Sequence, residues 1–266
     1  MGKSDDDPYL LAYSSFSFEL RAVRELNRVL SKSIQTFKKE HEAKMMKKLS
    51  NLPAAKQNEV MKINRQFVDF LKTKGSFDYT SEEEIEAITS NYFINSLLLP
   101  ERFSSFARNM SLVYVIVEFE SFLKQLLEVT FKQRPETLTC YKKSLTFEDL
   151  LNCENLESAK QEIVDKEISD VINEGIKGQA KYFDKTFCIS MEKNVDWDRF
   201  TERFYRRNTL VHNEGIADKA YRKATGCRKK NVSLKVSEKY LNETIDLFEM
   251  MADNLSNDLS KKFIIN

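Results

Sequence analysis

The chain has few of the residues that interrupt helices. Its 266 residues include six glycines and four prolines. Both residue types end or kink helices, so their scarcity in a chain rich in leucine, lysine, glutamate and asparagine favours helix throughout. The sequence contains no glycine-rich phosphate-binding loop and no internal repeat. We therefore expect an all-α protein.

Metal ligands are also scarce. The chain has two histidines, and its four cysteines are widely spaced without a Cys-x-x-Cys pair. This composition argues against a zinc site, so we predict no metal and no cofactor. Free thiols in a reducing compartment are the simpler interpretation of the cysteines.

No apolar run approaches the length of a membrane span, and the first residues lack the apolar segment of a signal peptide. Asp6 breaks the myristoylation pattern that Gly2 would begin. We therefore expect a cytoplasmic protein without a membrane partner. The formal net charge of +1 excludes a polycation that binds any nucleic acid by charge alone, so RNA binding would need a local basic patch.

The helical patterns predict two parts. Residues 14–50 and 54–74, separated by a break at 51–53, read as a helical hairpin, and we assign residues 1–95 to this N-terminal extension. Residues 96–266 form the main domain. Its expected helices cover residues 100–131, 156–175 and 197–215, and a last helix is capped by Ser237 and has an apolar stripe from Leu241 to Leu259. Gly175 and Gly178 predict a flexible break before a short segment at 181–187.

The stretch 197–215, WDRFTERFYRRNTLVHNEG, contains one of the two histidines. Its apolar residues form a stripe with helical spacing, namely Trp197, Phe200, Phe204 and Val211. Arg207 and Asn208 border this stripe, and His212 lies further round the helix. Polar groups at such a margin are solvated, face a partner that completes them, or form a site. The other histidine, His41, lies in a charged helix end and is expected to be a solvated or half-covered helix residue, not a catalytic one.

The segment Arg207-Asn-Thr-Leu-Val-His212 fits the Arg, four to six residues, His motif of the HEPN superfamily. The wider run 206–221 resembles the branch whose motif reads Arg-Asn, three residues, His-Asn-x-Gly, then Asp and Tyr. The order of motif helix, basic loop and long amphipathic helix is also similar, and the resemblance covers at least residues 100–262. Catalytic members of this superfamily are metal-independent endoribonucleases.

The resemblance implies a HEPN-type helical bundle in which the 2′-hydroxyl of RNA attacks the adjacent phosphate, leaving 2′,3′-cyclic phosphate and 5′-hydroxyl ends. His212 would transfer protons, because histidine titrates near neutrality, and Arg207 would neutralise charge on the phosphoryl oxygens. Asn208 would bind the phosphate or hold the histidine. An acid on an early helix would orient Arg207 or Asn208. By helical angle that acid is Glu120, since Glu118 points away from the apolar stripe.

Arg207 and His212 diverge by about 140° around the helix, so one helix does not supply a whole site. HEPN domains pair their motif helices across a two-fold axis, which implies a homodimer with Phe204 and Val211 at its interface. RNA-backbone contacts are assigned to five basic residues, Arg203, Arg206, Lys219, Arg222 and Lys223. The alternatives are arginines paired with Glu202 or Asp198, and a merely charged surface loop.

The resemblance places the protein in antiviral defence or among toxins, with RNA and a regulatory or antitoxin protein as partners. The His-x-Tyr motif of HEPN toxins that are modified by a nucleotidyltransferase is absent, because residue 214 is Glu. Two other functions stay open. One is a non-catalytic HEPN module that binds nucleotides or RNA, or only dimerises, as a sensor or scaffold. The other is a helical adaptor that acts through residues 14–95.

Overall fold

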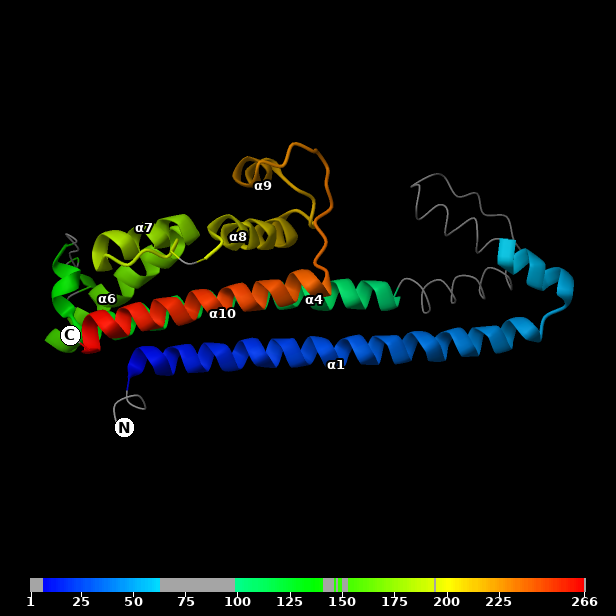
Figure 1. Cartoon of the computed structure of the whole chain (residues 1–266), viewed down its shortest axis with the longest axis horizontal. Helices are drawn as coiled ribbons and strands as arrows, with labels where there is room; N and C mark the ends of the chain where they lie inside the picture. The colour runs from blue at the N-terminus through cyan, green and yellow to red at the C-terminus, as the bar shows by residue number, and fades with distance from the viewer. Residues whose placement is uncertain are drawn as a thin grey trace. The chain divides into compact units, whose positions relative to one another are not determined.

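The computed structural model describes residues 7–62, 99–140, 146, 148–149, 153–193 and 195–265. These residues are predominantly helical, and the sole β interaction among them is an isolated bridge between Ile216 and Ser233 (Figure 1). The all-α class is thus confirmed. The helices are α1 (Pro8–Ser50), α4 (Leu99–Gln133), the 3₁₀ helix η2 (Pro135–Cys140), α6 (Leu156–Asn173), α7 (Gly175–Phe187), α8 (Trp197–His212), α9 (Lys219–Thr225), α10 (Glu238–Ser260) and the π-helix η3 (Lys261–Ile265). None of the described helices has an apolar stretch long enough to cross a membrane.

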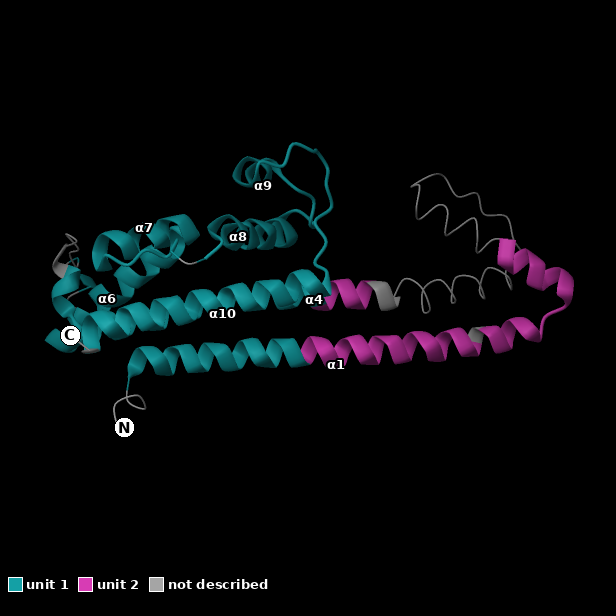
Figure 2. Cartoon of the chain, in the orientation of Figure 1, with its two compact units in different colours: residues 1–25, 108–266 teal, residues 26–107 magenta. Residues whose placement is uncertain are grey.

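The chain divides into two compact units (Figure 2). Unit 1 contains residues 1–25 and 108–266, and unit 2 contains residues 26–107. This division differs from the predicted boundary after residue 95, because the start of α1 belongs with the C-terminal helices. Its residues Tyr9, Phe16 and Leu20 are buried in the core of unit 1, where the Phe16 ring stacks on Phe122 of α4 at 5.1 Å between centroids.

A cluster of phenylalanines fixes α8 against α4 and α10 in unit 1. Phe119 of α4 lies 5.3 Å from Phe200 and 5.1 Å from Phe248, measured between ring centroids. Phe204 stacks on Phe248 at 5.6 Å and is 6 % exposed. The predicted place of Phe204 at a dimer interface is therefore wrong, because the side chain is part of the monomer's core. Buried aromatic packing of this kind fixes the rotation of α8 and so the direction of every polar residue on it.

Unit 2 contains residues 26–50 and 54–62 of the predicted hairpin, and residues 14–25 belong to unit 1. The second helix of the hairpin begins at residue 54, as predicted, and its residues 63–74 lie outside the described ranges. His41 is half-buried: its ring lies 4.0 Å from that of Phe37, and its Nδ1 is 3.0 Å from the Phe37 carbonyl oxygen.

The junction between α6 and α7 is sharper than predicted. Only Glu174 separates the two helices, and α7 continues from Gly175 through Gly178 to Phe187, so the expected flexible break is wrong. Gly175 has φ +69°, a conformation that glycine adopts without steric cost, and this allows the abrupt change of direction. Gly178 leaves room for the Glu174 side chain, whose Cβ would lie 2.5 Å from any Cβ added at position 178. The two glycines thus form a compact corner.

Candidate functional site

Helix α8 carries the predicted site and is capped at both ends. The Asp196 carboxylate accepts a hydrogen bond from the Arg199 amide at its start. The helix ends at His212, three residues earlier than predicted. His212 therefore lies in the last turn, next to the loop that leads to α9.

The Asn and Gly of the His-Asn-x-Gly run build the turn that ends α8. The Asn213 side chain donates to the Ile216 carbonyl at 2.5 Å, and the Gly215 amide donates to the Thr209 carbonyl at 3.0 Å. Gly215 has φ +75°, and a Cβ there would lie 3.2 Å from Cδ2 of Leu210. A side chain at position 215 would thus be strained and crowded.

The Asp and Tyr of the same run anchor α9 to α8. Asp218 caps α9 by accepting from the Tyr221 amide at 2.7 Å, and the Tyr221 hydroxyl donates to Glu202 of α8, also at 2.7 Å. These positions in the motif act structurally, because they fix where the chain goes after His212.

Arg207 of α8 and Glu120 of α4 form a part-buried ion pair. Arg207 Nη2 lies 2.5 Å from Glu120 Oε1, and the two side chains are 22 % and 26 % exposed. Burial raises the pKa of Glu120, and the charge and hydrogen bond of Arg207 lower it only in part, so the pKa stays above its ordinary value. Arg207 Nε is buried without an acceptor among the described residues. The guanidinium is therefore held in place while most of its donors remain unused.

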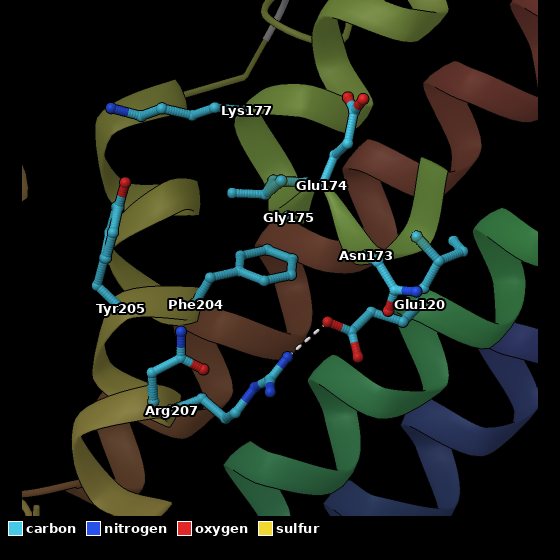
Figure 3. A pocket seen from close by; sticks show the side chains of 11 residues that line it. Glu120, Asn173, Glu174, Gly175, Lys177, Phe204, Tyr205 and Arg207 are labelled. Atoms are coloured by element: carbon cyan, nitrogen blue, oxygen red, sulfur yellow. Dashed lines mark hydrogen bonds and ion pairs between the residues drawn. The ribbon is translucent and has the colours of Figure 1, made fainter. Parts of the chain in front are cut away.

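This pair borders an open pocket of about 480 Å³ (Figure 3). Helix α8 contributes Phe204, Tyr205, Arg207 and Asn208 to its walls, and α4 contributes Glu120. The opposite wall is residues 172–177, the corner between α6 and α7. Three of the predicted catalytic residues, Glu120, Arg207 and Asn208, thus meet at one pocket.

His212 does not line this pocket. Its side chain is exposed, and it has no hydrogen-bond partner in the described part of the chain. Val211 is 52 % exposed and Ile216 is 41 % exposed. The end of α8 therefore presents a histidine beside two uncovered apolar side chains.

The structure corrects the assignment of Arg203 and Arg206 to RNA binding. Arg203 is 4 % exposed; it donates to Thr244 Oγ1 at 3.2 Å and to Glu202 Oε2 at 2.9 Å. Arg206 donates to Glu202 Oε1 at 2.8 Å and to the Lys235 carbonyl at 2.9 Å. Both guanidiniums also lie over the Tyr240 ring. The sequence leaves open a pairing of these arginines with Glu202, and the structure shows that pairing. Both guanidiniums are therefore engaged by groups of the protein itself.

The remaining basic candidates lie on α9. Lys219 and Lys223 are exposed, whereas Arg222 is half-buried and donates to the Asp218 carbonyl at 3.2 Å. Sequence reasoning missed Lys177 and Tyr205, which line the pocket with the Lys177 Nζ 5.8 Å from the centre of the Tyr205 ring. No sequence signal links these two residues, because their proximity arises from the packing of α7 on α8.

Comparison with models of known families, with curated proteins and with solved structures finds no significant match to the chain. Within the described ranges, no group of three or more His, Cys, Asp and Glu side chains is placed to hold a metal ion. The chemistry of the site must therefore be argued from its own residues.

Proposed function

We propose that the protein is a metal-independent endoribonuclease of the HEPN type. The observation that carries this proposal is the Arg207 guanidinium, which Glu120 holds through Nη2 at the edge of an open pocket. A planar, permanently charged donor in this setting suits a phosphate whose oxygens gain charge during reaction. Asn208, exposed on the same rim, adds an amide donor.

The reaction needs two proton transfers. The 2′-hydroxyl loses a proton as its oxygen bonds to phosphorus, and the 5′-oxygen gains one as its bond to phosphorus breaks. His212 is the residue suited to this work near neutral pH. His212 does not line the pocket of its own chain, and the HEPN resemblance pairs motif helices, so a second copy would bring an imidazole to Arg207. We therefore propose a homodimer through the exposed end of α8, in which the two imidazoles share the two transfers.

Unrestrained RNA cleavage would suit antiviral defence or a toxin, controlled by a regulatory or antitoxin protein in the cytoplasm. The exposed lysines of α9, Lys219 and Lys223, would contact the RNA backbone.

A second candidate function is a non-catalytic HEPN module that binds RNA or nucleotides. The position of His212 outside the pocket favours it, because a single chain has the anion-binding half of the site without the proton-transfer half. RNA cleavage decides between the two candidates, because a non-catalytic module that dimerises would associate as the enzyme does.

The test of function is cleavage of an end-labelled RNA in excess EDTA. We expect wild type to cut and to leave 2′,3′-cyclic phosphate ends, which are identified by their conversion to a mixture of 2′- and 3′-phosphates with acid. Arg207→Ala should be inactive, whereas Arg228→Ala, at an exposed arginine of the same unit, should cut normally. A requirement for added magnesium, or activity in Arg207→Ala, would overturn the proposal. RNA binding without any cleavage would favour the non-catalytic module.

Val211→Asp should weaken self-association by roughly a hundredfold, because two carboxylates would face each other near the two-fold axis. Val211 is 52 % exposed, so the substitution should leave the fold of the monomer intact. Analytical ultracentrifugation measures the association, and the RNA assay should show a parallel loss of cleavage.

The matched control is Val117→Asp, on α4, where the valine is 47 % exposed. This variant should associate and cut as wild type does. If Val211→Asp remains fully dimeric, the end of α8 is not the interface.

A further inference from the structure

The part of the pocket away from the Arg207–Glu120 pair has features that phosphate chemistry alone does not use. Its residues include Tyr205 from α8, with Lys177 from α7 lying across the Tyr205 ring. In Figure 3, Lys177 lies at one end of the pocket and the Arg207–Glu120 pair at the other, with Tyr205 between them on the α8 side. An aromatic ring thus lies between two cationic side chains.

We propose that this pocket is a subsite for one unpaired nucleotide of the RNA, whose base packs on Tyr205 and whose two flanking phosphates lie at Arg207 and Lys177. The inference rests on the proposed function, because it assigns the substrate element that the nuclease site holds. It identifies Tyr205 and Lys177 as positioning residues that contact the RNA next to the reacting phosphate.

The Tyr205 ring is supported for such a role. It is partly buried and packs against the small cluster of Ala217, Tyr221 and Leu234, so part of its surface is fixed by the protein while another part lines the pocket. Bases of single strands stack on aromatic side chains held in this way, and every base has a face that can do so. Lys177 is exposed and flexible, and it can exchange its contact with the ring for one with a phosphate.

The size of the pocket determines whether it accepts single-stranded or double-stranded RNA. A volume of about 480 Å³ lies within the range of small-ligand sites and suits one nucleotide, not a stacked duplex. A base within a helix must leave its stack before it can enter such a pocket. The subsite therefore selects single-stranded or looped RNA over double-stranded RNA.

The test uses a 2′-O-methyl RNA 12-mer, which has no attacking hydroxyl, so binding is measured without cleavage. Fluorescence anisotropy compares the labelled single strand with its duplex on the full chain. Wild type should prefer the single strand, and Tyr205→Ala should weaken single-strand binding by about tenfold to a hundredfold. Tyr205→Phe, which keeps the ring, should bind within about twofold of wild type. Tyr114→Ala, at an exposed tyrosine of α4, is the matched control and should bind as wild type does.

Lys177→Ala is a second test of the subsite that does not depend on whether the Tyr205 variant folds. Lys177 is exposed, so its substitution should leave the fold intact. The substitution should weaken binding and reduce the slope of log affinity against log salt by about 0.7, and Lys177→Arg should restore both. The subsite is wrong if the duplex binds as tightly as the single strand, or if Tyr205→Ala and Lys177→Ala both bind normally. If wild type cleaves RNA but these variants bind the 2′-O-methyl strand as wild type does, the subsite is wrong and the nuclease proposal stands. Binding as expected without cleavage by wild type would overturn the nuclease and leave the subsite.

Discussion

His212→Ala should lower kcat/KM for RNA cleavage by about 10²–10⁴-fold, the usual contribution of a residue that transfers a proton in the transition state. His41→Ala should cleave as wild type does. The chain has no other histidine, so these two variants together test every imidazole in the protein. Gel-based kinetics on a labelled RNA measure both.

His212→Ala tests the chemistry more directly than Arg207→Ala, because it should leave the stability of the fold unchanged. His212 is exposed and has no hydrogen-bond partner among the described residues, so its removal should change the free energy of unfolding by less than about 0.5 kcal/mol. Removing Arg207 leaves the partly buried Glu120 carboxylate without its counter-charge. Loss of activity in His212→Ala, with unchanged melting temperature and dimer mass, therefore reports on chemistry alone. Full activity in that variant would remove histidine from the mechanism.

Helical periodicity predicted the elements that surround the site because it depends on local residues. The last helix begins after the Ser237 cap, where the Ser237 hydroxyl accepts from the Tyr240 amide at 3.1 Å. Helical angle also distinguished Glu120 from Glu118, and Glu120 is the acid that contacts Arg207. An angle around one helix suffices for this choice, because α4 and α8 both direct their apolar stripes to the same core.

Periodicity gives the face of a helix but not how far along that face a neighbour extends. Phe204 and Val211 lie on the same side of α8, yet Phe204 packs on Phe248 while Val211, in the last turn, is 52 % exposed. The burial of Arg203 likewise depends on Thr244 and Tyr240 of α10, which no pattern within α8 indicates. Such contacts are tertiary, and a single sequence contains no local signal for them.

Glu202→Ala should lower the free energy of unfolding by about 3–5 kcal/mol, because it leaves a buried guanidinium without its partner. The Glu202 carboxylate accepts hydrogen bonds from Arg203, Arg206, Tyr221 and Tyr240 at 2.7–2.9 Å, and so joins α8 to α9 and α10. Urea unfolding followed by the fluorescence of Trp197, the single tryptophan, measures the loss.

The control for this loss is Glu243→Ala. Glu243 pairs with Arg199 at 2.7 Å, but that arginine is 51 % exposed. A surface pair of this kind contributes at most about 1 kcal/mol, so the control should unfold near wild type. Equal effects of the two substitutions would show that the buried network does not stabilise the fold.

The Glu202 carboxylate should also make the free energy of unfolding depend on pH. Burial acts to raise the pKa of Glu202, but the hydrogen bonds from Tyr221 and Tyr240 and the charge of Arg206 outweigh it and hold the pKa below its ordinary value. The unfolded chain therefore takes up the proton first, and the contribution of Glu202 is complete above the ordinary glutamate pKa of about 4.3 and is lost as the pH falls through the folded value. Glu120, whose pKa is raised, changes stability in the opposite direction, but it is present in both wild type and Glu202→Gln. The difference in unfolding free energy between these two proteins should thus shrink from pH 7 toward pH 3, and a constant difference would show that folding does not lower the pKa of Glu202.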